Sequence, residues 1–467
     1  MERIYGFNDK IISADDAVNK FFKNINSIAF SGMGGQSVPK EIPEAIHSNL
    51  NTNNAITLYT GGGTTKSFEK YMSGLNISRR YYYLSDSTGR LKVNSGKTFM
   101  MDYFVSQYSG MLRYNQNMID IGVIEATAIN GNGIVPSLSL DSTLSIIKAS
   151  RKIIIEINTS KPDLSGLHDI YSLREHSIIR IKNVNDRIGS TTLKINSRKI
   201  AGIVLSDKKE EPASSYSKPR ENHEQISGNI WEIIDRLNLY KNPIQVGAGS
   251  IASDLIDNSP VSQLKLWCEI IPSKWHQYIG NKIKMVSGSA IYTLPGDEHY
   301  TETFLNNFRD FKDNMVLRPN DITNSKEVIS RLNVITIQQA IQVDIYGSAN
   351  VSHIDGNIYN GVGGSGDFCG TGKYTMVVLN SVTKDKKHST IVPLLPNVDI
   401  PRQYVDFVVT ENGIADLRWK DPRERAVEII NKCAHVDFKD RLLKYFNKNN
   451  YKHMPYNFND ASEFYGA

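Results

Sequence analysis

The stretch KIIIEIN at residues 152–158 decides the fold class, because it is short, rich in β-branched residues and apolar at most positions. A strand that is covered by helices on both faces has this character, whereas a half-exposed strand alternates apolar and polar residues. The stretch AGIVLS at residues 201–206 has the same character. Such strands are typical of largely parallel sheets, whose neighbouring strands are joined by helical crossovers.

Helix-forming segments alternate with these strands along the chain. In SADDAVNKFF, Ser13 is the expected N-cap, with two aspartates in the first turn. In DPRERAVEIINKC, Asp421 is the expected N-cap and Pro422 occupies the first helical position. The alternation therefore continues through the second half of the chain. Strands are expected there at residues 334–346, 375–381 and 406–410.

A polar segment separates the two alternating stretches. Residues 207–225, DKKEEPASSYSKPRENHEQ, are charged, contain two prolines and have no apolar period, which is typical of a linker. A long surface loop within one domain is the alternative. We therefore predict an α/β protein with two open α/β/α domains and mostly parallel sheets, which span residues 1–215 and 216–467.

Charge and composition exclude several classes of protein. The 54 basic and 49 acidic residues leave a net charge of +5 over 467 residues, which is too dilute for nucleic-acid binding or a polybasic membrane anchor. No stretch has the ~18 unbroken apolar residues that a membrane span requires. The N-terminal MERIYGFNDKIIS has neither a signal-peptide core nor the character of a transit peptide, so a cytoplasmic location is expected.

The usual signatures of zinc sites and of hydrolase nucleophiles are missing. Cys268, Cys369 and Cys433 are widely separated, so we expect neither a disulfide framework nor a metal site. The ten histidines are scattered, with no i, i+4 pair on a predicted helix. A GxSxG motif in its strand–turn–helix setting is also absent, which leaves a serine hydrolase without its nucleophile.

Glycine is concentrated in four clusters, and each follows an apolar stretch. Glycines between a strand and a helix let backbone N–H groups approach an anion, which favours a phosphate-bearing or carboxylate ligand. A tight turn with positive φ is the alternative for each cluster. No cluster is a Walker loop or a complete GxGxxG, which disfavours a nicotinamide dehydrogenase. The clusters lie at residues 31–35, 61–63, 247–250 and 361–372.

One carboxylate lies within an apolar run. Glu269 follows Trp267 and Cys268 in QLKLWCEII, residues 263–271. A carboxylate that is removed from water is costly unless it is hydrogen-bonded, and such groups are enriched at functional sites. The alternative is that strand alternation turns Glu269 towards solvent. Glu269 is therefore a candidate functional residue.

Ordered sequence blocks run along nearly the whole chain. They are SGMGGQSVPKEIPEAI, IGVIEATAINGNGIVPS, GLHDIY and VNDRIGS in the first half, and PIQVGAGSIA, LWCEII, VLRPNDITNSKEVISRL, AIQVDIYGSANVSHIDGNIYNGVGGSGDF, HSTIVPLL, VVTENGIADLRWKDPRERA and HMPYNFNDA in the second. With these blocks the chain resembles the acetyl-CoA hydrolase/transferase family, the class I CoA-transferases that include succinyl-CoA:acetate CoA-transferases. The resemblance implies a tandem of two CoA-transferase domains, of which the second carries the catalytic glutamate.

The resemblance implies catalytic roles for individual residues. Glu269 matches the catalytic glutamate, while Asn324 and the backbone N–H of Gly364 match the oxyanion hole. Glu411 matches a further active-site glutamate. Taken alone, Asn324 fits equally well as a helix N-cap before residues 325–329, and Glu411 fits as a solvent-facing acid at a strand end.

The resemblance also implies contacts with coenzyme A, and it reveals three departures from the family pattern. Cys268 replaces a small hydroxyl residue beside the glutamate, Gln338 stands where asparagine is common, and Gln342 replaces a more usual glutamate. The change at Cys268 bears on acyl-chain preference more than on the chemistry. The residues that match CoA contacts are Gly247, Ala248, Gly249, Ser250 and Ile251 in one loop, together with Asn360, Gly364 and Lys384.

The implied activity is the transfer of CoA between a short-chain acyl-CoA, such as acetyl-CoA or succinyl-CoA, and a free carboxylate such as acetate. A glutamate can attack a thioester to give a mixed anhydride, and the CoA thiolate can then return to give a glutamyl-CoA thioester. Coenzyme A is thus a substrate and part of an intermediate, no tightly bound cofactor is expected, and the expected assembly is a homodimer. An acyl-CoA hydrolase and a non-catalytic CoA-binding protein are the alternatives.

Overall fold

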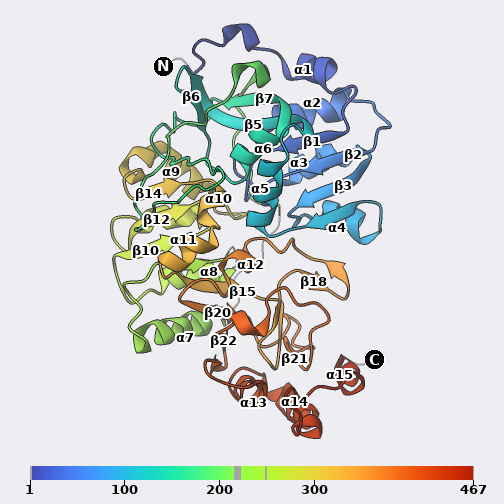
Figure 1. Ribbon diagram of the computed structural model, residues 1–467, viewed down its shortest axis with the longest axis vertical. Helices are drawn as coiled ribbons and strands as arrows, with labels where there is room; N and C mark the ends of the chain where they lie inside the picture. The colour runs from blue at the N-terminus through green and yellow to red at the C-terminus, as the bar shows by residue number, and fades with distance from the viewer. Residues whose placement is uncertain (1–2, 215–221, 248–249, 466–467) are drawn as a thin grey trace.

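The computed structural model describes residues 3–214, 222–247 and 250–465 of the chain. Two large sheets dominate it. Figure 1 shows the first sheet, in blue to cyan, above the second, in green to orange, with the C-terminal helices in red at the bottom. In each sheet all strands but one run parallel to their neighbours. The predicted α/β class with mostly parallel sheets is therefore confirmed.

The first sheet has helices on both faces. In β7, Ile153 and Ile155 belong to the core that includes α5 and α6, whereas Ile154 belongs to the core formed with α1, α2 and α3. The unbroken apolar character of this strand follows from burial on both faces. In spatial order the strands are β4 (Phe99–Asp102), β3 (Ile77–Tyr82), β2 (Ile56–Tyr59), β1 (Ser27–Phe30), β5 (Ile119–Asn130), β7 (Ser150–Asn158) and β8 (Ile200–Ser206), with β6 (Gly133–Pro136) antiparallel to β5.

The first-half helices begin where local sequence signals place them. The side chain of Ser13 accepts a hydrogen bond from the backbone N–H of Asp16, so the predicted N-cap of α1 is confirmed. The helices of this half are α1 (Ala14–Phe21), α2 (Glu41–Asn49), α3 (Lys66–Met72), α4 (Ser87–Asn94), α5 (Val105–Tyr114) and α6 (Thr143–Ala149).

The second sheet repeats this arrangement. In β20, Met376 and Val378 belong to the core that includes α7, α8 and α9, and Val377 belongs to the core that includes α13 and α14. The spatial order is β14 (Met315–Leu317), β12 (Ile283–Gly288), β10 (Leu264–Trp267), β9 (Ile244–Val246), β15 (Ile335–Gln339), β20 (Tyr374–Val378), β22 (Phe407–Thr410) and β23 (Gly413–Asp416). Shorter sheets pair β11 (Ile270–Pro272) with β13 (Ala290–Tyr292), β16 (Gln342–Asp344) with β17 (Ala349–Asn350) and β21 (Ile391–Val392), and β18 (His353–Ile354) with β19 (Asn357–Ile358).

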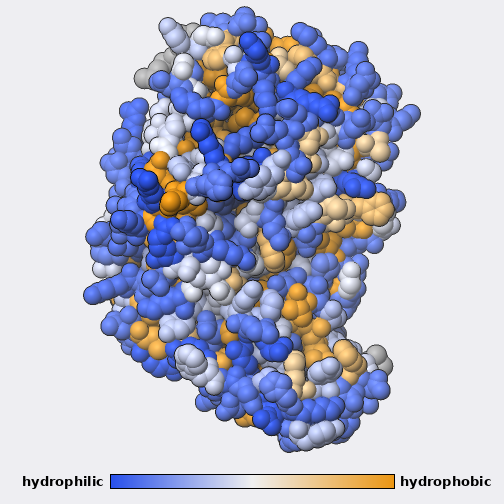
Figure 2. All heavy atoms as spheres, in the orientation of Figure 1, coloured by the Kyte–Doolittle hydropathy of each residue, from blue (hydrophilic) through white to orange (hydrophobic). Residues whose placement is uncertain are grey.

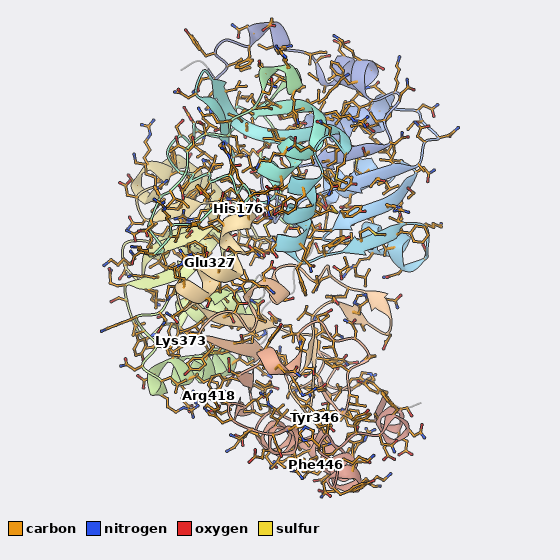
Figure 3. The ribbon with its side chains drawn as sticks, viewed as in Figure 1. His176, Glu327, Tyr346, Lys373, Arg418 and Phe446 are labelled. Atoms are coloured by element: carbon orange, nitrogen blue, oxygen red, sulfur yellow. The ribbon has the colours of Figure 1, made fainter. Side chains whose placement is uncertain are left out.

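The helices of the second half include the predicted one at residue 421. Asp421 and Glu424 form a capping box at the start of α13, as its sequence predicts. Tyr346 and Phe446 pack in the same core near the C-terminal helices (Figure 3). The helices are α7 (His223–Arg236), α8 (Ser250–Asp257), α9 (Glu298–Phe311), α10 (Asn320–Thr323), α11 (Lys326–Arg331), α12 (Ser365–Phe368), α13 (Pro422–Lys432), α14 (Val436–Asn449) and α15 (Phe458–Tyr465).

The single strand predicted at residues 334–346 is wrong. The structure divides it into β15, in the large second sheet, and β16, in a small sheet with β17 and β21. Between them Ala340 and Ile341 line a cavity. The chain therefore leaves the large sheet at its carboxyl edge, a change of direction that an apolar run does not reveal.

Part of the first half covers the second sheet. Apolar side chains within residues 179–184 share a core with Trp267 of β10. The carboxylate of Asp169 forms a buried ion pair with the guanidinium of Arg318, directly after β14. The two halves are thus interleaved. The predicted boundary at residue 215 lies outside the described residues, and the division into two domains stays a prediction.

The described parts of the segment predicted as a linker, residues 207–225, differ in secondary structure. Residues 207–214 contain no helix or strand, yet the Ala213 N–H donates to Thr293 O at 3.0 Å. Helix α7 starts at His223, so the last three residues of the predicted linker are helical. The linker prediction is wrong for these residues, because the apolar period of α7 begins only after its polar first turn.

The surface and the cysteines have ordinary features. The face in Figure 2 is mostly hydrophilic, with hydrophobic patches separated by polar side chains. No helix in the described part of the chain has the length and apolar character to cross a membrane. Cys268, Cys369 and Cys433 are free and buried. Within the described ranges, no group of three or more His, Cys, Asp and Glu residues could hold a metal ion.

Candidate active site

A cavity of about 540 Å³ lies between the two halves of the chain. Its walls are the loops that follow β1, β2 and β3 of the first sheet and β9, β10 and β15 of the second. Open parallel sheets bind ligands at this carboxyl edge, and the volume is typical of a small-molecule site. Residues that line it include Met33, Gly34, Gly62, Gly63, Tyr82 and Tyr83 from the first half and Val246, Gly247, Glu269, Gln338, Asn360 and Gly364 from the second.

The four predicted glycine clusters all contribute to this lining. Two of them pair directly, because the Gly34 N–H donates to Gly62 O at 2.8 Å. The carboxylate of Asp141 accepts from the Gly62 N–H at 3.2 Å. A Cβ at Gly61 would overlap Gly32 O, so only glycine allows the two loops to approach this closely. The structure thus brings together backbone loops that lie far apart in the sequence.

Two basic residues also line the cavity. Lys66 begins α3, directly after the glycine cluster at residues 61–63. The Arg90 side chain donates to Tyr359 O at 3.0 Å, and its guanidinium carbon lies 4.7 Å from the centroid of the Tyr359 ring. Positive side chains next to glycine-rich loops suit a ligand that carries phosphate groups.

Glu269 lies at the bend between β10 and β11. Its backbone is fixed from the neighbouring strand connection, where the Ser289 N–H donates to Glu269 O at 2.8 Å. Its half-buried side chain lines the cavity, and Oε2 accepts a hydrogen bond of 2.5 Å from Nδ2 of Asn324. The alternative of a solvent-facing position within a strand is therefore wrong.

The surroundings of Glu269 favour its neutral form. Burial, opposed by the hydrogen bond from Asn324 and assisted by the nearby carboxylates of Asp367 and Asp141, raises the pKa of Glu269 to about 8. A carboxyl group that lines a cavity and has a pKa raised by burial and by neighbouring carboxylates is typical of a functional site. Both the position of Glu269 in the cavity and its raised pKa are therefore features of a functional residue.

Asn324 is fully buried between α10 and α11. Ser325, not Asn324, occupies the N-cap position of α11, so the helix-cap alternative is wrong. The indole N–H of Trp267 donates to Thr323 O at 2.9 Å, which ties this turn to the end of β10. The turn therefore presents the Asn324 amide to Glu269.

Gly364 comes closer to Glu269 than a residue with a side chain could. A Cβ at position 364 would overlap Glu269 Oε2 and would lie 2.8 Å from Asn324 Nδ2. Among the described residues, no acceptor is found for the Gly364 N–H. An N–H group without a protein partner beside a reactive carboxyl is suited to bind a developing oxyanion.

We expect Gly364→Ala to lower CoA turnover by about 10²-fold, because a displacement of about 1 Å of a reacting group costs this much. The added methyl group would push the Glu269 carboxyl away from its position. Gly228→Ala is the matched control, since Gly228 lies in α7 with open space around its Cβ direction. Turnover by Gly364→Ala within twofold of the parent, measured in the same assay, would contradict the steric argument.

Several residues assigned by resemblance lie elsewhere. Lys384 is exposed and does not line the cavity. The Glu411 carboxylate accepts hydrogen bonds from the N–H and Oγ of Ser381, at 2.9 and 2.6 Å, and it does not line the cavity either. Ser250 and Ile251 are the first two residues of α8, and the Ile251 side chain is buried in the core. Ala248 and Gly249 lie outside the described residues. The roles that the resemblance implies for these residues, an active-site role for Glu411 and CoA contacts for the others, stay predictions.

The three departures from the family pattern differ in position. Gln338 lines the cavity, and its Nε2 donates to Gln245 Oε1 at 2.7 Å. Gln342 lies in β16, away from the lining. Cys268 is buried, with its thiol 3.8 Å from Ile244 O, and it does not line the cavity. The expected influence of Cys268 on acyl-chain preference therefore stays a prediction without a direct contact.

Sequence reasoning missed several residues of the site. Asp367 contacts Asn324, Asp141 anchors a glycine loop, and Tyr82 and Tyr83 line the cavity. One signal was present, because Asp367 is an acid inside the glycine cluster at residues 361–372. An acid in that position is unusual for a loop that binds anions, and it could have been examined as a possible site residue.

Comparison with known proteins identifies the family of the chain. The acetyl-CoA hydrolase/transferase N-terminal domain matches residues 1–187, and the C-terminal domain of the same family matches residues 301–446. The chain is 34% identical over 458 residues to the succinyl-CoA:acetate CoA-transferase of Clostridium kluyveri, covering 94% of this chain and 84% of that one. It is 33% identical over 471 residues to the acetyl-CoA hydrolase of Schizosaccharomyces pombe, covering 94% and 90%. The chain therefore belongs to the acetyl-CoA hydrolase/transferase family, and it is an enzyme of that family.

Solved structures share the fold. RipA from Yersinia pestis has a TM-score of 0.73 at 18% identity, covering 95% of this chain and 98% of that one. A 4-hydroxybutyrate CoA-transferase from Porphyromonas gingivalis has a TM-score of 0.67 at 18% identity, with the same coverage. The likeness extends over both sheets and supports the predicted tandem arrangement of the fold.

Proposed function

We propose that the protein is a CoA-transferase that exchanges CoA between a short-chain acyl-CoA and a free carboxylate, with Glu269 as the nucleophile. The observation that carries the proposal is the contact of the Glu269 carboxyl with the Asn324 amide and the Gly364 backbone inside the cavity. Acetyl-CoA or succinyl-CoA as donor and acetate as acceptor are the substrates that the similarity to the Clostridium kluyveri enzyme favours.

The reaction consists of four acyl transfers. The Glu269 carboxylate attacks the thioester carbonyl, the C–S bond breaks, and CoA leaves as a thiolate, so that an acyl-glutamyl anhydride remains. The thiolate then attacks the glutamyl carbonyl of the anhydride, which releases the first carboxylate and leaves a glutamyl-CoA thioester. The acceptor carboxylate attacks this thioester to form a second anhydride and release the thiolate. Attack of the thiolate on the new acyl carbonyl gives the product acyl-CoA and restores Glu269.

Each transfer passes through a tetrahedral oxyanion. Nδ2 of Asn324 donates to the Glu269 carboxyl, and the backbone of Gly364 lies against it, so we assign the Asn324 amide and the Gly364 N–H as the donors to this charge. No proton is gained or lost in any of the four transfers. The protein therefore needs hydrogen-bond donors at this place more than a general acid or base.

Recognition of coenzyme A is proposed along the glycine loops. Asn360 and Gly247 line the cavity, as do Lys66 and Arg90, whose charges suit the phosphate groups of CoA. By resemblance, Lys384 remains a proposed CoA contact and Glu411 a proposed active-site glutamate, although neither lines the cavity. Ala248, Gly249, Ser250 and Ile251 are included in the proposal as CoA contacts. The proposed assembly is a homodimer in the cytoplasm, and light scattering of the purified protein can test the size of this assembly.

An acyl-CoA hydrolase is the second candidate, because the chain is also 33% identical to a protein described as an acetyl-CoA hydrolase. Hydrolysis needs a water molecule and a base that removes its proton. No histidine is among the described residues that line the cavity, and Asp141 already accepts four side-chain or backbone hydrogen bonds. These observations favour the transferase.

Incubation with an acyl-CoA in the absence of an acceptor is expected to leave CoA attached covalently to Glu269. A transferase excludes water from its intermediates, so the thioester survives until a carboxylate arrives. The peptide that contains Glu269 should gain the mass of CoA less one water. Sodium borohydride should inactivate the protein only after acyl-CoA has been added, because it reduces a thioester and spares a carboxylate.

Kinetics provide the second readout of this experiment. Exchange is expected to follow a ping-pong pattern in which the free carboxylate is the second substrate. Steady release of CoA without an acceptor, at a rate comparable to exchange, would instead identify a hydrolase. Binding of acyl-CoA with neither an adduct nor turnover would identify a non-catalytic CoA-binding protein.

A further inference from the structure

The side-chain amide of Asn324 contacts two carboxylates. Its Nδ2 lies 2.5 Å from Glu269 Oε2 and 3.1 Å from Asp367 Oδ2, while its Oδ1 accepts from the Thr323 hydroxyl at 2.9 Å. An amide nitrogen has two hydrogens, so both are used here. In the flipped amide, Oδ1 would face Glu269 Oε2 and Asp367 Oδ2. An amide oxygen and an ionised carboxylate both accept hydrogen bonds, so these two contacts would have no hydrogen between them. Asp367 therefore selects this amide orientation, because an ionised carboxylate only accepts hydrogen bonds, whereas the Thr323 hydroxyl suits either orientation.

Asp367 is itself held from the other half of the chain. It is fully buried in α12, and it accepts hydrogen bonds from the N–H and the Oγ of Ser106 in α5, at 3.0 and 2.5 Å. A buried carboxylate is stable only when hydrogen bonds replace its water. With Asn324 as the third donor, each oxygen of Asp367 has a protein partner, so the position of the carboxylate is well determined.

We propose that Asp367 is a positioning residue, which accepts one N–H of the Asn324 amide and thereby holds the other N–H at Glu269, where the carbonyl reacts. Ser106 supplies the connection between the first half of the chain and this amide. The inference rests on the proposed roles of Glu269 and Asn324. It adds to them a residue that touches neither substrate nor nucleophile.

The charge of Asp367 acts on Glu269 as well. The titratable groups that face Glu269 are Asp367 in α12, Asp141 after β6, and Tyr82 and Tyr83 at the end of β3. A negative neighbour disfavours the ionised carboxylate, so Asp367 raises the pKa of Glu269. Removal of this charge lowers that pKa. The ionised nucleophile then forms at a lower pH, and the rise of kcat with pH moves in the acid direction.

Two substitutions separate the charge from the geometry. In Asp367→Asn, the side-chain oxygen can still accept from Asn324 and the Ser106 N–H, and the new amide can donate to the Ser106 hydroxyl. In Asp367→Ala, both functions are lost. Asp367→Ala is expected to lower kcat by about 10²-fold with KM for acyl-CoA within about twofold, like the loss of one oxyanion donor. Asp367→Asn should retain more of kcat and shift its pH midpoint to lower pH.

Asp344→Asn is the matched control. Asp344 is also buried, with its pKa raised by burial to about 6, and it accepts from the N–H groups of Tyr346 and Ser348 away from the cavity. This control is expected to lower thermal stability without moving the pH midpoint. Ser106→Ala keeps the backbone donor and loses the hydroxyl, so its kcat should fall several-fold with the KM unchanged.

The outcomes distinguish this inference from the proposed function. If the parent protein forms no CoA adduct on Glu269, the proposed function fails. If the parent forms the adduct, the inference is overturned by a pH midpoint that does not move in Asp367→Asn. It is equally overturned if kcat of Asp367→Ala stays within threefold of the parent. Should Asp367→Ala not fold, Asp367→Asn and Ser106→Ala decide the question with the same two readouts.

Discussion

Glu269→Ala should abolish CoA exchange, with a loss of roughly 10⁴-fold or more, while CoA still binds. The substitution removes the carboxylate that we propose to form the covalent intermediates, and it leaves the glycine loops of the cavity in place. Exchange of label between acyl-CoA and carboxylate measures the loss, and calorimetry with CoA measures the binding. Glu269→Asp should also fail, because a carboxylate withdrawn by one methylene no longer reaches the thioester.

The matched control for Glu269 is Glu327→Ala. Glu327, labelled in Figure 3, is an exposed glutamate of α11 that pairs with Arg331 of the same helix. Surface pairs of this kind contribute little to stability, so exchange within about twofold of the parent is expected. Residual exchange within tenfold in Glu269→Ala would remove Glu269 from the mechanism.

Asn324→Ala should lower kcat by about 10²–10³-fold with little change in the affinity for CoA. The amide acts mainly on the oxyanion that forms in the transition state, and one such donor is worth about this much. The same hydrogen bond also lowers the pKa of Glu269, so its loss should raise that pKa above its value of about 8 in the parent. The rise of activity with pH is then expected at higher pH than in the parent.

Asn314→Ala is the control for Asn324. The Asn314 amide donates to Lys284 O at 2.9 Å, away from the cavity, and its removal should leave kcat unchanged. Comparable losses in both variants would point to a general effect on the fold. A loss of thermal stability in Asn324→Ala with intact turnover would show that the residue is structural.

Lys384 and Glu411 match functional positions of the family, but neither residue lines the cavity. Both match functional positions in order along the chain, but a match in order carries no information about distance. The Glu411 carboxylate is occupied by the backbone and hydroxyl of Ser381, and Lys384 is exposed in the following turn. A predicted contact with a long ligand such as CoA therefore needs the path of that ligand, which a bound complex would show.

The sequence by itself determined the class of fold, several of the strands, the starts of α1 and α13, and the candidate nucleophile. These features depend on local signals, because an apolar run such as β7 reports burial on both faces and a capping residue such as Ser13 reports a helix start. The glycine clusters are local signals too, since each marks a place where the backbone turns tightly or approaches another group closely. Glu269 was visible because an acid interrupts an apolar run.

Only the tertiary structure decided which side chains meet at Glu269. Ser106, Asp367 and Asn324 lie in three separate helices or turns, and their hydrogen bonds form because loops from both sheets converge at one edge. Apolar periodicity predicts each strand and helix but not how loops of different strands cross. The break between β15 and β16 escaped prediction for the same reason, because a turn that is stabilised by distant contacts leaves no local signal. Packing between the halves, which no single segment encodes, therefore positions the site.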